Sequence, residues 1–119
     1  MSLPGPGLVN RRNGAVLARQ VERAVSVRAR LRGLLGRTAL PEGAALVIEP
    51  CTSIHTFFMR FPIDVAFVAR DGRVLRAISD LRPWRATRLY PAAALVVELP
   101  AGTLQRTQTR DGDGLDFVV

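Results

Sequence analysis

Short apolar runs, each bounded by glycine, proline or aspartate, dominate the pattern of hydrophobic and polar positions along this chain. Runs of this length between turn residues are typical of β-strands. Asp71-Gly72 between two of the runs predicts a hairpin with a type I′ turn. Phe61-Pro62 separates another pair of apolar runs and predicts a second hairpin. The strands that we assign are residues 16–21, 44–49, 53–60, 64–69, 73–79, 93–99 and 115–119.

One segment follows a helical period instead. Its apolar stripe recurs at i, i+4, i+7 and i+8, in Val27, Leu31, Leu34 and Leu35. Ser26 is a suitable N-cap and Gly36 a suitable stop, so we predict a helix over residues 26–35. The polar residues 103–110 leave room for one helical turn. Residues 1–14, rich in Gly, Pro and Asn, predict a flexible tail.

These elements together predict a mainly β fold with one short N-terminal helix. The number of strands and turns favours an antiparallel β-sandwich or a barrel-like, jelly-roll-like arrangement. A chain of 119 residues is typical of one domain and is long enough to bury a core. We therefore expect a single β-sandwich domain over residues 15–119, preceded by the tail over residues 1–14.

The net charge of +7 lies entirely in the first third of the chain. Residues 1–39 hold eight arginines and one acid, whereas residues 40–119 hold nine of each. A solvated surface explains this best, and the alternative is a nucleic-acid or acidic-surface interface built from the Arg-rich residues 11–37. No apolar run reaches the roughly 18 residues of a membrane span, and the start of the chain lacks a signal peptide. These features predict a soluble cytoplasmic protein.

Three rare side chains with soft donor atoms, Cys51, His55 and Met59, lie four residues apart. Thiolate, imidazole and thioether together suit Cu(I) or a similar ion. On the strand predicted over residues 53–60, however, neighbours four apart would be separated by about 13 Å, too far to share one ion. The same distance argues against a Cys51–His55 nucleophile pair. We therefore expect no metal and no cofactor, and assign Cys51 and Met59 to the core.

Polar residues within apolar strands are the remaining candidates for a site. If the second hairpin forms with the register that pairs Met59 with Asp64, then His55 and Asp64 share a face and can form a hydrogen bond. Such a pair either fixes the fold or contributes to a binding site. Trp84 and Arg85, in a predicted loop, could stack on a base, a sugar or a cation, or could plug the end of the sandwich. A second buried polar network is predicted from Arg60, Arg82 and Glu98.

Several motifs of this chain resemble the bacterial and archaeal family known as domain of unknown function 192. The matching segments are RLRGLLGRTAL (30–40), SIHTFFMRFPIDVAFV (53–68), DGRVL (71–75), PWR (83–85), VELPAGT (97–103) and the ending GDGLDF. The resemblance implies a compact, mainly β sandwich with a short helix near the start. It implies no activity, because the family has no established one. Some relatives carry export signals; from the composition of residues 1–14 we expect none in this chain.

Our leading functional hypothesis is a non-catalytic binding or accessory module. Its site would combine His55, Asp64, Trp84 and Arg85, and its partner would be a small polar or anionic molecule or another protein. One alternative is a hydrolase-like enzyme that uses His55 and Asp64 with an activated water. Another is binding of nucleic acid or an acidic surface through residues 11–37.

Overall fold

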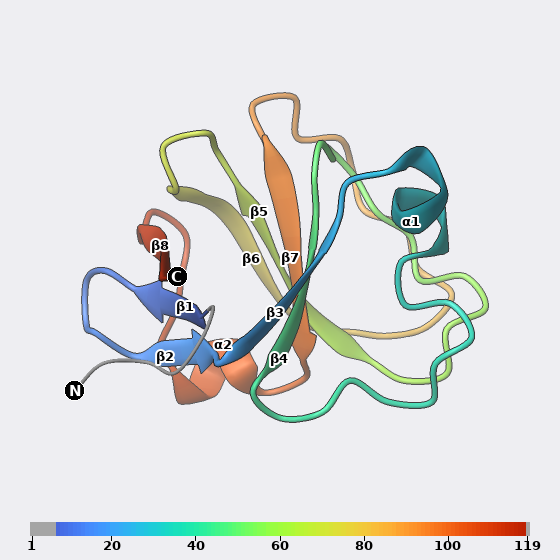
Figure 1. The fold of residues 1–119 in the computed structure, drawn as a ribbon, viewed down its shortest axis with the longest axis horizontal. Helices are drawn as coiled ribbons and strands as arrows, with labels where there is room; N and C mark the ends of the chain where they lie inside the picture. Colours follow the sequence, from blue (N-terminus) through green and yellow to red (C-terminus); the bar gives the residue numbers. More distant parts are fainter. Residues whose placement is uncertain (1–6, 119) are drawn as a thin grey trace.

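The computed structural model describes residues 7–118, which form eight strands and two short helices. They are arranged as a three-stranded sheet in the order β2-β1-β8 and a five-stranded sheet in the order β3-β4-β7-β5-β6. The small sheet and the first helix lie on opposite sides of the five strands (Figure 1). The elements are β1 (Gly7–Asn10), β2 (Val16–Ala18), β3 (Gln20–Ala24), α1 (Val27–Arg32), β4 (Ala44–Ile48), β5 (Ile63–Val68), β6 (Val74–Leu81), β7 (Leu95–Pro100), α2 (Thr103–Arg106) and β8 (Leu115–Val118).

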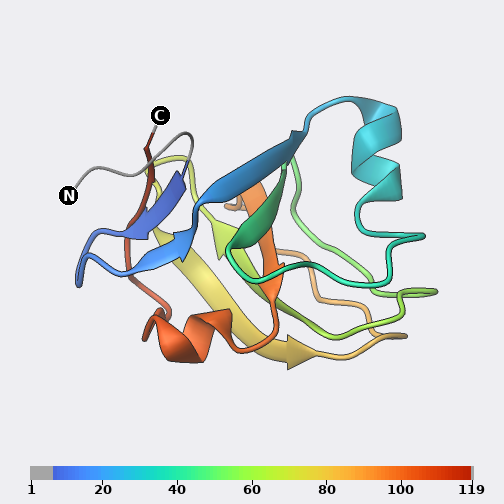
Figure 2. The same cartoon turned by 60° about the horizontal axis from the view of Figure 1, so that its bottom comes forward.

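The prediction of a mainly β fold is confirmed, and neither sheet closes into a barrel within residues 7–118. All strand pairs but one are antiparallel, the exception being the parallel pair of β3 and β4. A parallel pair needs a crossover connection. The chain supplies it between residues 25 and 43, where α1 lies beyond one end of the strands (Figure 2).

The three central strands of the five-stranded sheet, β4, β7 and β5, are buried on both faces. Successive side chains of a strand point to opposite faces, so Val47 of β4 joins the core under the small sheet, while Ile48 joins the core on the α1 side. The same alternation sends Val97 of β7 to the first core and Val96 to the second. Strands that are buried on both faces have continuous apolar sequences, which explains why β4, β5 and β7 are predictable from the sequence.

The predicted flexible tail is wrong for residues 7–14, and residues 1–6 lie outside the described residues. Strand β1 pairs with β2 and β8, with Leu8 opposite Phe117 and fully buried. Asn10 donates hydrogen bonds of 3.0 Å to Thr109 and Asp113, and Arg12 lies 2.7 Å from the Asp113 carboxylate. The composition indicates a tail, but Asn10 is turned inward as a hydrogen-bonding residue.

The strand predicted over residues 53–60, with its hairpin at Phe61-Pro62, is also wrong. The segment forms a loop whose one β-bridge joins His55 to Ala86, and β5 pairs with β6 and β7 instead. Thr56 binds the loop between β6 and β7, residues 82–94, at Arg82 and Arg85. The backbone groups of the segment therefore find their partners in a neighbouring loop, and local β-propensity does not decide the structure here.

The hairpin predicted at Asp71-Gly72 forms between β5 and β6, but the turn is not of type I′. A type I′ turn needs positive φ at both central residues, and only Gly72 of the pair has one, at 92°. The amide of Gly72 donates to Ala69 at 2.9 Å, so Gly72 follows the tight turn rather than forming its centre. This arrangement is typical of a turn followed by a glycine bulge.

Helix α1 is shorter than predicted. Ser26 caps it as expected, since its Oγ accepts from the amide of Ala29 at 3.1 Å. The helix ends at Gly33, with φ 49°, rather than at Gly36. The predicted apolar stripe is therefore divided: Leu34 is buried beyond the helix, whereas Val27 and Leu31 are 64% and 75% exposed. The exposed half of the stripe lines a cavity.

Candidate ligand pocket

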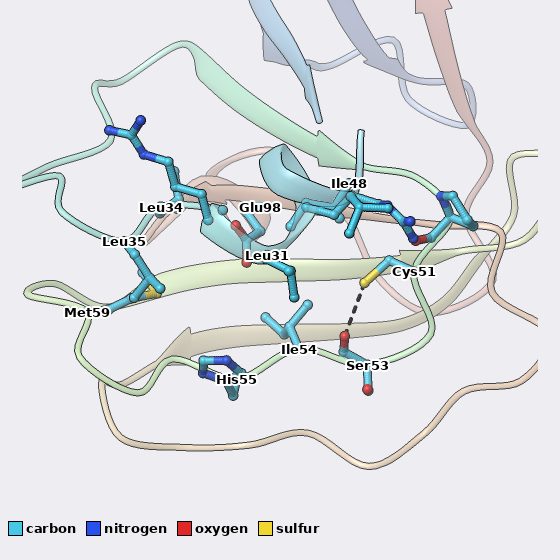
Figure 3. A pocket seen from close by; sticks show the side chains of 15 residues that line it. Leu31, Leu34, Leu35, Ile48, Cys51, Ser53, Ile54, His55, Met59 and Glu98 are labelled. Atoms are coloured by element: carbon cyan, nitrogen blue, oxygen red, sulfur yellow. Dashed lines mark hydrogen bonds between the residues drawn. The ribbon is translucent and has the colours of Figure 1, made fainter. Parts of the chain in front are cut away.

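A cavity of about 290 Å³ lies between α1, the end of β4 and the loop of residues 51–59. Its walls are mainly apolar, and one carboxylate, that of Glu98, reaches it from β7. Figure 3 shows this carboxylate between Leu31 and Leu34, with Cys51 and Ile54 on other parts of the wall. The apolar lining residues are Val27, Leu31, Leu34, Leu35, Ile48, Ile54 and Met59.

Glu98 is the residue that the strand register forces into this cavity. It lies opposite Leu46 of β4 and Val65 of β5, both of which are apolar. The side chain is 3% exposed, and within residues 7–118 its carboxylate has neither a hydrogen-bond donor nor an ion-pair partner. Burial raises the pKa of Glu98 to about 7, and the charge of Arg37 opposes this effect. An ionised carboxylate in this place is therefore destabilised until something pairs with it.

Glycine at position 33 leaves the carboxylate uncovered. A Cβ atom placed on Gly33 would lie 4.0 Å from Oε1 of Glu98 and 3.9 Å from Cδ1 of Ile48. The positive φ of this residue, 49°, also favours glycine. Gly33 thus ends α1 and leaves the space beside the Glu98 carboxylate free of a side chain.

The arginines around the cavity have other partners or lie at its edge. Arg30 donates to the carbonyl of Pro50 at 3.1 Å, although its Nε is buried without a partner. Arg37 donates to Glu22 at 2.8 Å. Arg32 lines the cavity but is exposed. The cavity therefore contains an unpaired carboxylate with cationic groups at its rim.

Cys51, His55 and Met59 all line this cavity, because the segment that carries them is a loop and not a strand. Burial raises the pKa of the Cys51 thiol, which donates to the carbonyl of Ser53 at 3.1 Å. Nδ1 of His55 accepts from the amide of Phe57 at 3.2 Å. Within the part of the chain that the structure describes, no three His, Cys, Asp or Glu residues come close enough together to hold a metal ion.

His55 connects the cavity to an exposed aromatic cluster. Its ring stacks on Phe57 with a centroid distance of 5.0 Å, and Phe57 and Phe58 lie 6.2 and 4.6 Å from Trp84. Thr56 holds the two loops together: its hydroxyl lies 2.6 Å from the carbonyl of Arg82 and accepts from the amide of Arg85 at 2.9 Å. The structure thus places His55 and the Trp84–Arg85 loop side by side.

Asp64 is not part of this site, and the predicted His55–Asp64 pair does not form. Asp64 shares a face of β5 with Ala66, which belongs to the core under the small sheet. It is fully buried, and its two oxygens each accept a 2.8 Å hydrogen bond, from the amides of Asp80 and Leu104. Asp64 therefore joins β5 to the end of β6 and to α2.

The predicted network of Arg60, Arg82 and Glu98 does not form either. Arg60 and Arg82 are exposed, and Arg82 approaches Asp80 at 3.7 Å. Arg85 is likewise exposed beside Trp84. Glu98 was correctly singled out as a polar residue within an apolar strand, but the partner assigned to it was wrong.

The Arg-rich segment over residues 11–37 does not present one uniform basic surface. Four of its arginines are paired with acids, and three of these acids come from residues 40–119. These pairs are Arg11–Asp116, Arg12–Asp113, Arg23–Glu49 and Arg37–Glu22. Much of the local excess of positive charge is therefore neutralised within the fold, which weakens the nucleic-acid alternative.

The sequence did not predict that α1 and its following loop form part of the site. Val27 and Leu31 belong to the apolar stripe predicted for the helix, and in the structure both are exposed and line the cavity. The available signal is the early glycine: Gly33 ends the helix before Leu34 and Leu35, so these two residues reach the cavity wall from the loop that follows α1.

The comparisons with known proteins identify a family. The family model described as an uncharacterised group, domain of unknown function 192, matches residues 8–117, and the chain belongs to this family. A UPF0127 protein of Thermococcus sibiricus is 29% identical over 116 residues, covering 94% of this chain and 75% of the relative. A UPF0127 protein of Pyrococcus abyssi is 35% identical over 66 residues, covering 56% of each chain.

A solved structure shares the fold. The crystal structure of a protein of unknown function from Novosphingobium aromaticivorans superposes with a TM-score of 0.81 at 23% identity, covering 93% of this chain and 83% of that one. In the described part of our chain, neither helix has the length or the apolar character that crossing a membrane requires.

Proposed function

We propose that this protein is a non-catalytic binding module whose site is the cavity between α1 and residues 51–59. The observation that carries the proposal is the Glu98 carboxylate, which is 3% exposed and unpaired at an otherwise apolar cavity. Buried carboxylates normally have partners. A mainly apolar cavity with few polar groups is also typical of small-molecule sites. A ligand that covers the apolar wall and provides a hydrogen-bond donor fits both features.

The site that supports this proposal differs from the one predicted from the sequence. His55 remains, as a wall residue, and Trp84 and Arg85 lie next to it through Phe57. Asp64 is not part of the site, because backbone amides already donate to both oxygens of its carboxylate. The apolar walls favour a ligand with an apolar body over one that is wholly polar or anionic.

The arrangement supports binding better than hydrolysis. The raised pKa of Cys51 disfavours the thiolate, and the nearest hydrogen-bond acceptor for its thiol is a backbone carbonyl. His55 accepts a hydrogen bond from a backbone amide instead of contacting a carboxylate that could orient it. A hydrolase needs a nucleophile or water held by an oriented base, and His55 and Asp64 do not supply this arrangement.

Titration with hexan-1-ol, followed by NMR of the methyl groups, tests this proposal. We expect saturable shifts at millimolar concentrations that are confined to methyl groups of the cavity, such as those of Leu34, Ile48 and Met59. Cys51→Leu, which adds volume to the wall, should abolish them. Leu89→Ala, at an exposed position outside the cavity, should bind as the parent does. Shifts spread evenly over the surface, or no shifts at all, would overturn the proposal.

A further inference from the structure

Resting on this proposed function, we propose that the cavity selects a ligand that carries a protonated amine on a short apolar chain, with the Glu98 carboxylate as its counter-ion. The inference names the chemical class of the ligand. It depends on the position of the carboxylate, on the partners of the neighbouring charges and on the composition of the walls.

The carboxylate has no neighbour on its own sheet that could pair with it. Leu46 and Val65 lie opposite it in the register of the two flanking strands. On the helix side, Gly33 presents no side chain at all, and the position of its missing Cβ is 4.0 Å from Oε1. The free side of the carboxylate is therefore the cavity, where a ligand atom can approach it.

The cationic groups in and near the cavity come from α1 and the loop after it, and none of them forms an ion pair with Glu98. From α1, Arg30 binds the carbonyl of Pro50, and Arg32 is exposed. Arg37, from the loop after α1, binds Glu22. Arg30 and Arg32 line the cavity, whereas Arg37 lies outside its lining. Arg32 is exposed, so water and counter-ions screen its repulsion of an entering cation. Arg30 is directed to the Pro50 carbonyl, although its Nε is buried without a partner.

The remaining groups that can titrate come from the loop of residues 51–59. They are the Cys51 thiol, which donates to Ser53, and His55, which accepts from the amide of Phe57. Neither hydrogen bond reaches Glu98, and a raised thiol pKa keeps Cys51 neutral near neutral pH. Glu98 is thus the acceptor left for a ligand inside the cavity.

The walls suit an alkyl chain attached to such an amine. Leu34, Ile48 and Met59 are 2%, 4% and 6% exposed, so they form a firm inner wall. Leu31, at 75% exposed, stands at the mouth and can cover the outer part of a chain. A primary amine donates up to three hydrogen bonds and pairs with a carboxylate through a charge-assisted bond, which a hydroxyl cannot match.

The test compares three probes of equal chain length by NMR titration at pH 8: hexylamine, hexan-1-ol and hexanoate. At this pH the amine is protonated, and a carboxyl with a pKa of about 7 is mostly ionised. We expect hexylamine to bind at least tenfold more tightly than hexan-1-ol, and hexanoate more weakly than either. Glu98→Gln should remove the preference for the amine while hexan-1-ol still binds.

The matched control is Glu42→Gln, which makes the same change of charge at a carboxylate outside the cavity, 76% exposed and paired with Arg106. It should keep the preference for hexylamine. Equal binding of hexylamine and hexan-1-ol by the parent would overturn this inference and leave the binding module standing. If hexanoate bound more tightly than hexylamine, the arginines at the cavity would be the groups that select the ligand, and the inference of an amine ligand would also be overturned. If no probe binds, both proposals fail.

Discussion

Glu98 and Asp64 lie on the paired strands β7 and β5, yet their carboxylates face opposite sides of the five-stranded sheet. The register places Asp64 opposite Leu99 and Glu98 opposite Val65, so adjacent positions carry the two acids. Asp64 accepts two backbone hydrogen bonds on the side of the small sheet. Glu98 faces the α1 side without a partner. One carboxylate therefore stabilises the fold, and the other is open to a ligand.

Replacing Glu98 should change how stability depends on pH. Burial raises the pKa of Glu98 from its ordinary value of 4.5 to about 7. Between these values the unfolded chain releases the proton first, so the free energy of unfolding falls as pH rises. The full loss, above pH 7, is on the order of 3 kcal/mol. Glu98→Gln should remove this fall, as measured by urea unfolding from pH 4 to 8.

The control for Glu98→Gln is Glu42→Gln, because it removes the same charge at an exposed carboxylate. Glu42→Gln should keep the pH dependence of the parent. If the parent and Glu98→Gln lose stability in parallel over this range, the carboxylate of Glu98 is not desolvated in the folded state.

Replacing Asp64 should destabilise the protein. Asp64→Asn keeps one acceptor oxygen but turns an amide NH₂ towards one of the two backbone N–H donors. We expect a loss of about 2 kcal/mol in the free energy of unfolding. Asp80→Asn is the control, because it leaves the Asp80 amide, and so the bond to Asp64, in place. Equal effects of the two variants would contradict the assigned role.

The hydroxyl of Thr56 should control the position of Trp84. It bridges the two loops through Arg82 and Arg85, and the amide of Trp84 donates to the Thr56 carbonyl at 3.0 Å. Thr56→Val keeps the volume but removes the hydroxyl, leaving the part-buried amide of Arg85 without its acceptor. We expect a loss of about 1–2 kcal/mol, with a shift in the emission of Trp84, the one tryptophan of the chain.

Thr38→Val is the matched change at an exposed position. It should leave both the stability and the emission maximum of Trp84 unchanged. A Thr56→Val protein with the emission and stability of the parent would show that the loops are held together by other contacts.

Asp113 should hold the N-terminal strand in place down to low pH. Hydrogen bonds from Arg12, above all, lower the pKa of Asp113 to about 2, against a desolvation effect that raises it. A lowered carboxyl pKa adds stability above about pH 4, and this stability is lost as pH falls through 2. Asp113→Asn should speed hydrogen exchange of the β1 amides by roughly tenfold at pH 6, which corresponds to about 1.4 kcal/mol.

Asp116 provides the comparison, because its pair with Arg11 is about half exposed on both sides. Exposed ion pairs contribute little, so Asp116→Asn should change the exchange of β1 far less. Faster exchange in the Asp116 variant than in the Asp113 variant would assign the anchoring of β1 to the surface pair.

Much of the fold is predictable because the central strands are buried on both faces. The runs over residues 44–49, 64–69 and 93–99 match β4, β5 and β7 to within two residues at each end. Strand β1 and the loop of residues 51–59 are not predictable in this way. Leu8 and Val9 pair with β8, more than 100 residues away, and local composition carries no information about that partner.

The site was predictable only in part. Glu98 and His55 stand out in the sequence, because one interrupts an apolar strand and the other is the single histidine. Their relation to α1 depends on where the helix ends and how the loop of residues 51–59 folds, both of which are set by tertiary contacts such as those of Thr56. The strand predicted for that loop separated Cys51, His55 and Met59, whereas the folded loop brings them to one cavity.

The most direct test of the central claim is the titration of the Glu98 carboxyl carbon by ¹³C NMR, with and without hexylamine. The account predicts a pKa of about 7 in the free protein, because the carboxylate is buried without a partner. Saturating amine should lower this value, since a bound cation stabilises the ionised form. An ordinary pKa near 4.5 in the free protein, or a value near 7 that the amine does not change, would contradict the account.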